Sequence, residues 1–226
     1  MATAAVRPAV ADDVDKIVRI QAETWRTAYA ELVPTAAIDQ LTSLPARQAW
    51  AAAVTAGDGY HVLLATEGDR AVGFCAAALA AETPPGGAVD ESGREPTARR
   101  PPAPKPSDRG VTGEPGRDEP GARSSGAPDD PPEVGARHWA EIGALLVEPR
   151  WGRRGHGGRL LAAAAGALRT AGAIYGLAWI PETDQASRRF YARAGWGSDG
   201  QLRVLDAGDR ELREIRITGS LDLKLQ

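Results

Sequence analysis

The first part of the chain places apolar side chains at helical spacing. Val14, Ile17 and Val18 lie three and four positions apart, as they would on one face of an α-helix. Asp12 or Asp13 stands directly before this series, where a carboxylate caps a helix by accepting hydrogen bonds from its first amides. We therefore predict an amphipathic helix that starts at these aspartates.

A second helical stretch and a hairpin follow. Apolar residues at helical spacing precede Pro45, and an alanine-rich segment continues to about residue 54. Residues 60–80 then hold two apolar runs separated by Glu67-Gly68-Asp69-Arg70. Turn-forming residues between two β-like runs predict a β-hairpin.

The composition changes sharply in the middle of the chain. Residues 82–137 contain no Leu, Ile, Phe, Trp, Tyr or Met and hold most of the prolines. Such a segment cannot bury enough apolar surface to offset an ordering cost of roughly 1–2 kcal/mol per residue. We predict a disordered Pro/Gly-rich insertion at 82–137, rather than a further folded module, within a single domain that spans 1–226.

The part after the insertion alternates strand-like and helix-like segments. The predicted order is a strand over 138–149, a glycine-rich turn, an alanine-rich helix ending near Ala171-Gly172-Ala173, a buried strand over 174–180, a short helix from near Asp184, and two terminal strands around Ala207-Gly208-Asp209. Together with the first part, this order predicts an α/β domain with a mixed sheet.

Composition narrows the class of protein. The chain has 226 residues, 42% of them hydrophobic, and a formal net charge of −3, so we expect neither nucleic acid nor a membrane as its partner. No apolar run approaches the ~18 residues of a membrane span and no signal peptide is recognisable, so we expect a cytoplasmic protein. The single cysteine, Cys75, is interpreted as a small buried hydrophobe.

The glycine-rich turn, residues 147–161 (VEPRWGRRGHGGRLL), connects a predicted strand to a predicted helix. The first amides of such a helix are unpaired and favour an anion, and glycines let a phosphate approach them closely. The turn lacks the Gly-Lys-Ser/Thr of a P-loop and the G-x-G-x-x-G of dinucleotide-binding folds. Taken alone, it indicates either a pyrophosphate site or a tight structural connection.

Two motifs resemble those of the GNAT superfamily of acyl-CoA N-acyltransferases. The segment from Gly152 to Gly157 is similar to the family's Q/R-x-x-G-x-G/A loop, except that glycine stands at the first position. The segment from Asp184 to Trp196 is similar to the family's N-x-x-A-x-x-F-Y-x-x-x-G-F motif, with Asp for Asn and Ser for Ala. The early text ETWRTAYAELVP also resembles the first-helix region of one subgroup.

This resemblance implies a fold and a co-substrate. The fold is a mostly antiparallel sheet flanked by helices, with a splayed central strand pair, and the co-substrate is acetyl-CoA. The residues that the resemblance assigns to acetyl-CoA are Leu145, Leu146, Val147, Arg153, Arg154, Gly155, His156, Gly157, Gly158, Arg159 and Asp184. His156 is expected to contribute its backbone only.

The resemblance also implies a reaction, the transfer of an acetyl group to an amine in a ternary complex. Glu141 corresponds to the family's general base and Tyr191 to the acid that protonates the departing thiolate. The alternatives are a solvent-facing strand glutamate and a packed helix tyrosine. Glu148 is a weaker base candidate, because at the end of the strand it could simply be solvated. An amide near Val147 would stabilise the oxyanion.

The acceptor is expected to be a small-molecule or protein amine. Trp25 and Tyr29 are candidate acceptor contacts, with core packing as the alternative role. His61 and His138 have no ligand at metal-binding spacing, so no metal is expected. A homodimer is compatible with such a domain. The competing function is a non-catalytic acyl-CoA-binding regulatory or interaction module.

Overall fold

The computed structural model describes residues 3–57, 59–80, 139–207 and 210–223. Within these residues, seven strands form one sheet in the order β1-β2-β3-β4-β5-β7-β6. All neighbouring strands are antiparallel except β4 and β5, which are parallel. The strands are β1 (Ala4–Pro8), β2 (Tyr60–Glu67), β3 (Arg70–Leu79), β4 (Trp139–Val147), β5 (Tyr175–Pro181), β6 (Gly197–Asp206) and β7 (Glu211–Ser220).

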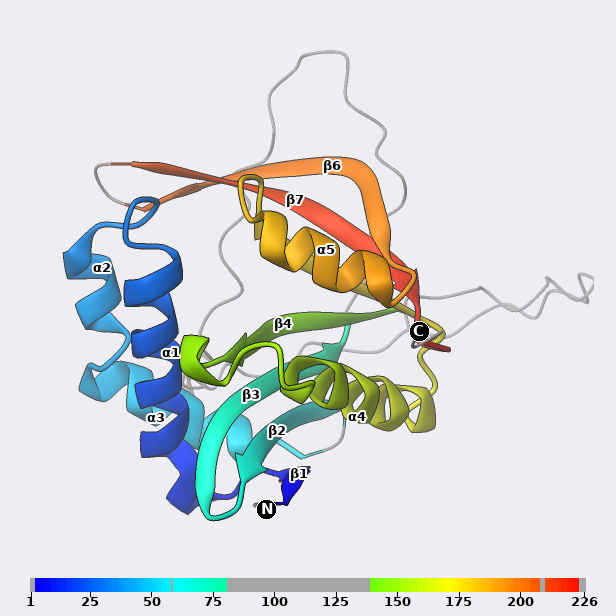
Figure 1. The fold of residues 1–226 in the computed structure, drawn as a ribbon, viewed down its shortest axis with the longest axis horizontal. Helices are drawn as coiled ribbons and strands as arrows, with labels where there is room; N and C mark the ends of the chain where they lie inside the picture. Colours follow the sequence, from blue (N-terminus) through cyan, green and yellow to red (C-terminus); the bar gives the residue numbers. More distant parts are fainter. Residues whose placement is uncertain (1–2, 58, 81–138, 208–209, 224–226) are drawn as a thin grey trace, which may run out of the picture.

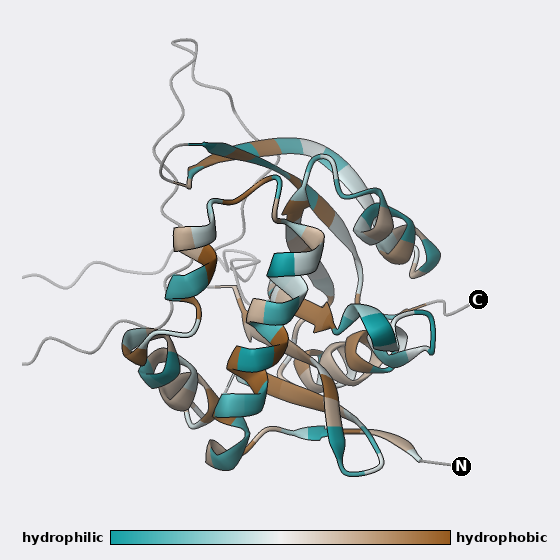
Figure 2. Cartoon of the chain, turned by 60° about the vertical axis from the view of Figure 1, so that its left-hand side comes forward, coloured by the Kyte–Doolittle hydropathy of each residue, from teal (hydrophilic) through white to brown (hydrophobic). Residues whose placement is uncertain are grey.

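Helices cover both faces of this sheet (Figure 1). Helix α4 packs on one face of β2, β3 and β4, and α5 lies on the same side. Helices α1 and α3 pack on the opposite face, against a second group of buried residues. Hydrophilic and hydrophobic bands alternate along α1 (Figure 2), as its predicted amphipathic pattern requires. The helices are α1 (Val14–Ala28), α2 (Thr35–Gln40), α3 (Leu44–Val54), α4 (His156–Thr170) and α5 (Gln185–Arg193).

The predicted mixed α/β sheet is confirmed, and three details at its start differ from the prediction. Strand β1 was not expected, since it is short, contains Pro8 and pairs only along β2. The second helical stretch consists of two helices, and Leu44, one of the apolar residues that precede Pro45 in the predicted helical pattern, is 67% exposed. Asp13 precedes α1, but its side chain does not cap the first amides of that helix. Instead the carboxylate accepts hydrogen bonds from Arg7, Lys16 and the amide of Val10.

The two central strands separate along their length. Strands β4 and β5 pair only from Trp139 to Glu141 and from Tyr175 to Leu177, although both continue beyond these residues. On its other side β4 stays paired with β3, with a register shift that makes Gly143 an extra residue. The expected splayed strand pair is therefore present, and no described strand pairs with the second half of β4 on the β5 side.

The predicted insertion at 82–137 lies outside the described residues, as does His138. No described helix has the length and apolar character needed to cross a membrane.

Candidate active site

A cavity of about 270 Å³ lies where β4 and β5 separate. Residues of α1 and α3 line it from one face of the sheet, and residues of α5 line it from the other, so the cavity passes through the sheet between the two strands. Its lining residues include Trp25, Tyr29, Trp50, Tyr60, Ile142, Gly143, Leu145, Leu146, Trp179, Ser187, Tyr191, Arg203, Leu205, Leu212 and Glu214.

Tyr191 reaches this cavity from α5. Its ring stacks on Trp196, with ring centroids 5.4 Å apart, and meets Phe190 edge to face. The side chain is buried, and its hydroxyl makes no hydrogen bond within the described residues. Burial raises the pKa of the phenol above its ordinary value. The phenol therefore stays protonated and has a proton to donate.

Glu141 lies on the other side of the sheet. Ala140 and Ile142 pack on the α4 side, so alternation along the strand directs Glu141 to the face that α1 and α3 cover. Burial and the charge of Glu214 raise the pKa of its carboxyl, while the charge of Arg203 opposes that shift. Within the described residues the Glu141 carboxylate makes no hydrogen bond or ion pair. Glu141 is thus a half-buried carboxylate that is unpaired among the described residues and is next in the chain to Ile142, which lines the cavity.

The unpaired edge of β4 offers backbone groups to the cavity. The amide of Glu148 donates to the carbonyl of Val72 on β3, at 2.9 Å. Successive amides in a strand point to opposite sides, so the Val147 amide points away from β3, toward the separation. Leu145 and Leu146 line the cavity beside it.

Glu148 is not solvated, contrary to the expectation from its position at the strand end. Its side chain is fully buried, and both carboxylate oxygens are engaged, one by Arg19 and the other by Arg150 at 2.7 Å. Arg19 also donates to the carbonyl of Ala71. Because its lone pairs are occupied by arginines, Glu148 joins the end of β4 to α1 and is a poor candidate for a base.

The glycine-rich turn has an irregular backbone that leaves several of its amides without backbone partners among the described residues. Gly155 precedes the first turn of α4 with a φ of +81°, and Arg153 also has a positive φ. The amides of Arg153, Arg154 and Gly155 donate no backbone hydrogen bond within the described residues, and the first three amides of α4 have no partner within the helix. The turn therefore gathers unpaired amides at the positive end of the helix dipole.

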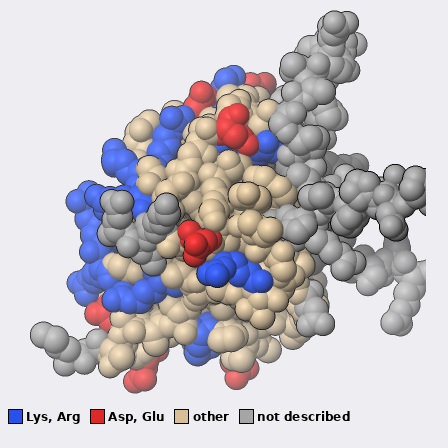
Figure 3. Space-filling model, turned by 90° about the vertical axis from the view of Figure 1, so that its right-hand side faces the viewer, with Lys and Arg blue, Asp and Glu red and all other residues tan. Residues whose placement is uncertain are grey.

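Charged side chains surround this turn. Arg153, Arg154 and Arg159 are exposed, and the Arg159 guanidinium folds back to donate to the carbonyl of Arg154 at 3.0 Å. Basic side chains gather along one edge of the face shown in Figure 3 rather than spreading evenly over it. On the inner side of the turn, Gly157 packs against Phe190, so that a Cβ there would lie 3.2 Å from the ring.

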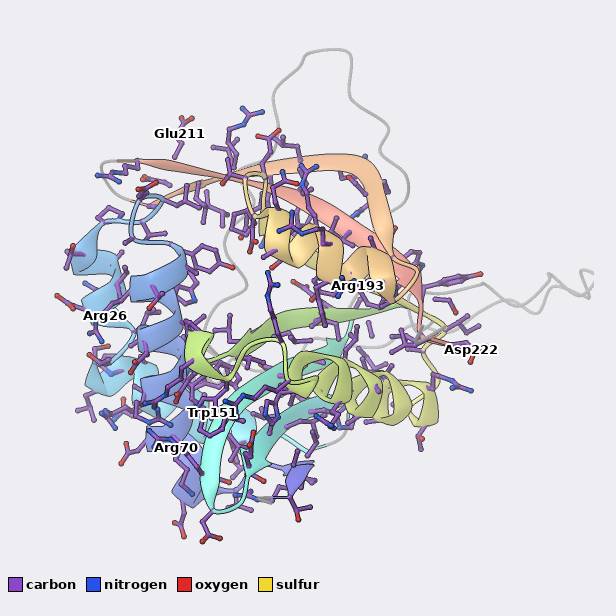
Figure 4. All side chains as sticks on the ribbon, viewed as in Figure 1. Arg26, Arg70, Trp151, Arg193, Glu211 and Asp222 are labelled. Carbon is purple, nitrogen blue, oxygen red and sulfur yellow. The ribbon has the colours of Figure 1, made fainter. Side chains whose placement is uncertain are left out.

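His156 ties the turn to the β2–β3 hairpin. The Nε2 atom of its buried ring lies 2.9 Å from Oε2 of Glu67, and its Nδ1 has no hydrogen-bond partner in the described part of the chain. Arg154 approaches the other oxygen of Glu67 at 3.3 Å and lies over the ring of Trp151. Figure 4 shows Trp151 on the segment that leads from β4 into α4. The side chain of His156 thus points beneath the turn, and Glu67 was not identified from the sequence because 89 positions separate it from His156.

Asp184 and the first-helix aromatics meet at the entrance to α5. The Asp184 carboxylate caps α5 by accepting from the amides of Ala186 and Ser187. It also accepts from the hydroxyl of Tyr29, at 2.9 Å. Burial and this carboxylate raise the pKa of the Tyr29 phenol, and the ring of Trp25 meets Tyr29 edge to face. Both aromatic residues are among those that line the cavity.

The terminal hairpin adds residues that the sequence did not single out. Arg203 on β6 pairs with Glu214 on β7, at 2.6 Å, and lies over the ring of Trp179, 4.4 Å from its centroid. All three side chains line the cavity. The only signal in the sequence is their alternation with apolar residues, which places them on one face of each strand but does not indicate what that face meets.

Two further groups bear on the chemistry. Cys75 is fully buried, and burial raises the pKa of its thiol to about 12, so it is not a thiolate at neutral pH. In the described part of the chain, no group of three or more His, Cys, Asp or Glu side chains could hold a metal ion.

Comparisons with known proteins agree with this geometry. Residues 115–196 match the sequence model of the Acetyltransferase (GNAT) family. No curated protein sequence gives a match.

Solved structures share the fold at low sequence identity. The PaiA N-acetyltransferase from Thermoplasma acidophilum, in complex with coenzyme A, has a TM-score of 0.58 at 11% identity, covering 96% of this chain and 99% of that one. The yncA protein from Salmonella typhimurium, with its cofactor acetyl-CoA, has a TM-score of 0.57 at 17% identity, covering 97% and 94%. The ribosomal-protein-alanine N-acetyltransferase from Brucella melitensis has a TM-score of 0.59 at 18% identity, covering 96% and 99%.

The family model covers the loop, α4, β5 and α5, which contain both motifs, and the fold similarity extends over almost the whole chain. The chain therefore has the fold of GNAT acetyltransferases, and its residues 115–196 resemble that family in sequence.

Proposed function

We propose that the protein is an N-acetyltransferase that moves the acetyl group of acetyl-CoA to an amine by direct attack. One observation carries the proposal: the cavity between β4 and β5 is lined by the phenol of Tyr191 and by Ile142, and the raised-pKa carboxyl of Glu141 is next to Ile142 in the chain and on the opposite face of the sheet from Tyr191. An amine and a thioester that met in this cavity would have a base and an acid on opposite sides of the reacting carbon.

Acetyl-CoA would enter along the unpaired edge of β4. The glycine-rich turn would bind the pyrophosphate through its unpaired amides, from Arg153 to Gly158, and the exposed arginines would add positive charge. Gly152, which lacks the side chain common at this position, would leave that binding mainly to the backbone. The pantetheine would then lie beside Leu145 and Leu146, with its thioester near Val147. Asp184 would contribute to this site by capping α5, the helix that carries Tyr191.

The proton transfers follow from this placement. An alkyl amine with a pKa near ~10 is mostly protonated at neutral pH, so the base Glu141 would take its proton, directly or through a water. The neutral nitrogen would attack the thioester carbon, and the Val147 amide would stabilise the oxyanion. Collapse of this intermediate would break the carbon–sulfur bond, and Tyr191 would protonate the departing thiolate. Cys75 is not required as an acyl carrier.

The test is the release of free thiol from acetyl-CoA in the presence of a mixed panel of small-molecule and peptide amines. We expect release that depends on an amine, and a lower rate in the Tyr191→Phe variant with unchanged acetyl-CoA affinity. Acetyl-CoA binding with no turnover on any amine would refute the proposal and favour the non-catalytic module.

A further inference from the structure

The acceptor end of the cavity has predominantly apolar walls. Trp25, Trp50 and the aliphatic side chains of Val33, Leu41, Leu205 and Leu212 line it. Five of these six side chains belong to the apolar cluster that joins α1, α2 and the terminal hairpin, or pack against it. A group that enters this end of the cavity therefore exchanges water for aromatic and aliphatic contacts, which favours an apolar substituent on the acceptor.

The cationic groups at this end already have partners. Arg203 is held by Glu214 through two contacts to one carboxylate oxygen, at 2.6 and 2.7 Å. Arg216, whose guanidinium lies 5.9 Å from the ring of Trp179, is paired with Asp199 at 2.7 Å. Glu141, by contrast, has no such partner within the described residues. Both arginines, Arg203 and Arg216, are therefore already paired with carboxylates, whereas the carboxylate of Glu141 has no cationic partner among the described residues.

This charge distribution discriminates between amines. An incoming ammonium would meet the aromatic residues that line the cavity and would lie near the carboxylate of Glu141, the chain neighbour of the lining residue Ile142, and both kinds of group stabilise a cation. A carboxylate on the same molecule would be desolvated without a free cation to pair with, which is costly in an enclosed site. The other polar side chains that line this end, such as Gln21 and Tyr60, are neutral.

The size of the cavity points the same way. Its volume of about 270 Å³ lies near the lower end of the roughly 300–1,000 Å³ typical of small-molecule sites, and the acetyl thioester must share it. That space suits one ring-sized substituent better than a folded protein surface.

From these observations we infer that the acceptor is a primary amine that carries an apolar, ring-sized substituent and no carboxylate. This inference rests on the proposed acetyl transfer and names the substrate class of that same site.

The experiment compares acceptors of matched shape by kcat/KM, with each rate expressed per neutral amine. Phenethylamine should exceed phenylalanine by at least tenfold, and phenylalanine methyl ester should recover most of the loss, because the ester masks the negative charge while adding bulk. Ethylamine, which lacks the ring, should be at least tenfold poorer than phenethylamine.

A variant tests the role of the ion pair. Glu214→Gln leaves Arg203 without its carboxylate partner and should lower the phenethylamine-to-phenylalanine ratio by at least tenfold. The substitution can also change the pKa of Glu141, but such a change affects both acceptors and therefore cancels in the ratio of their kcat/KM values. The ester comparison tests the same point in the wild-type protein if the variant does not fold.

The outcomes separate the two proposals. Faster turnover of phenylalanine, or of a peptide with an N-terminal alanine, than of phenethylamine would overturn the substrate class while leaving acetyl transfer in place. Bound acetyl-CoA with no turnover of any acceptor would overturn the proposed function, and the substrate class with it.

Discussion

Gly155→Ala tests whether the conformation of the glycine-rich turn matters for binding. Gly155 has a φ of +81°, a region in which a Cβ costs an L-residue about 1–2 kcal/mol. The added Cβ would also lie 3.2 Å from the Arg159 guanidinium, which is the mobile end of a side chain and can move away. The backbone penalty is therefore the larger effect.

This backbone penalty should appear either in the free energy of unfolding or in the affinity for acetyl-CoA. If the turn keeps its shape, the free energy of unfolding should fall by about 1–2 kcal/mol. If the turn changes shape, its amides no longer converge, and the Kd for acetyl-CoA should rise roughly 5- to 30-fold, the factor that corresponds to this energy. Urea denaturation and isothermal titration calorimetry measure the two effects on the same protein.

Gly166→Ala, inside the helix that follows the turn, is the matched control. A Cβ at Gly166 would meet nothing within 4 Å, and alanine in a helix interior is roughly 0.5–1 kcal/mol more favourable than glycine. This variant should be slightly more stable and should bind acetyl-CoA as the wild type does. Unchanged stability together with unchanged affinity in Gly155→Ala would refute the role assigned to the turn.

Three further predictions concern buried charges. Glu67→Ala removes the only hydrogen-bond partner that the His156 ring has among the described residues, so acetyl-CoA binding should weaken and the free energy of unfolding should fall by about 1–3 kcal/mol. Glu67→Gln, which keeps an acceptor, should lose less, and equal losses would argue against this tether. Glu141→Gln should raise the free energy of unfolding at pH 7, because the raised pKa of Glu141 makes its ionised form unfavourable in the folded protein. This gain should vanish below about pH 4, where the carboxyl is protonated in both the folded and the unfolded state. A variant less stable than the wild type at pH 7 would contradict this prediction. Asp13→Asn should lower the free energy of unfolding by about 1–3 kcal/mol at pH 7, because Arg7 and Lys16 hold the pKa of Asp13 well below its usual range. This stabilisation is present above the ordinary carboxyl pKa of about 3.9 and is lost as the pH falls below it. A difference in stability between wild type and variant that stays constant from pH 7 to pH 2 would contradict the prediction.

Local patterns predicted most of the fold. The helical spacing of α1, the turn residues at Gly68-Asp69 and the alanine-rich run of α4 each specify an element from a few neighbouring residues. Strand β1 was missed because five residues with a proline carry little periodic signal, and the strand exists only through its pairing with β2. The side chain of Asp13 was misassigned because Arg7, which pairs with it, is brought close by that strand.

The site was predicted less completely than the fold. The motifs located Tyr191 and the turn because short-range spacing defines them. Glu67, Arg203 and Glu214 could not be found in this way, because their positions depend on contacts between distant segments: the β2–β3 hairpin against α4, and β7 against β5. A single sequence shows which face of a strand a residue occupies but not what lies across from that face.

The most direct test of this account is the turnover number of Glu141→Gln. Glutamine keeps the size of the side chain but cannot accept a proton from the amine. We predict that kcat at neutral pH falls by roughly 10²- to 10⁴-fold, the usual contribution of a general base, while the Kd for acetyl-CoA stays within about twofold of wild type. A kcat within about threefold of wild type would show that Glu141 is not the base and would contradict the mechanism.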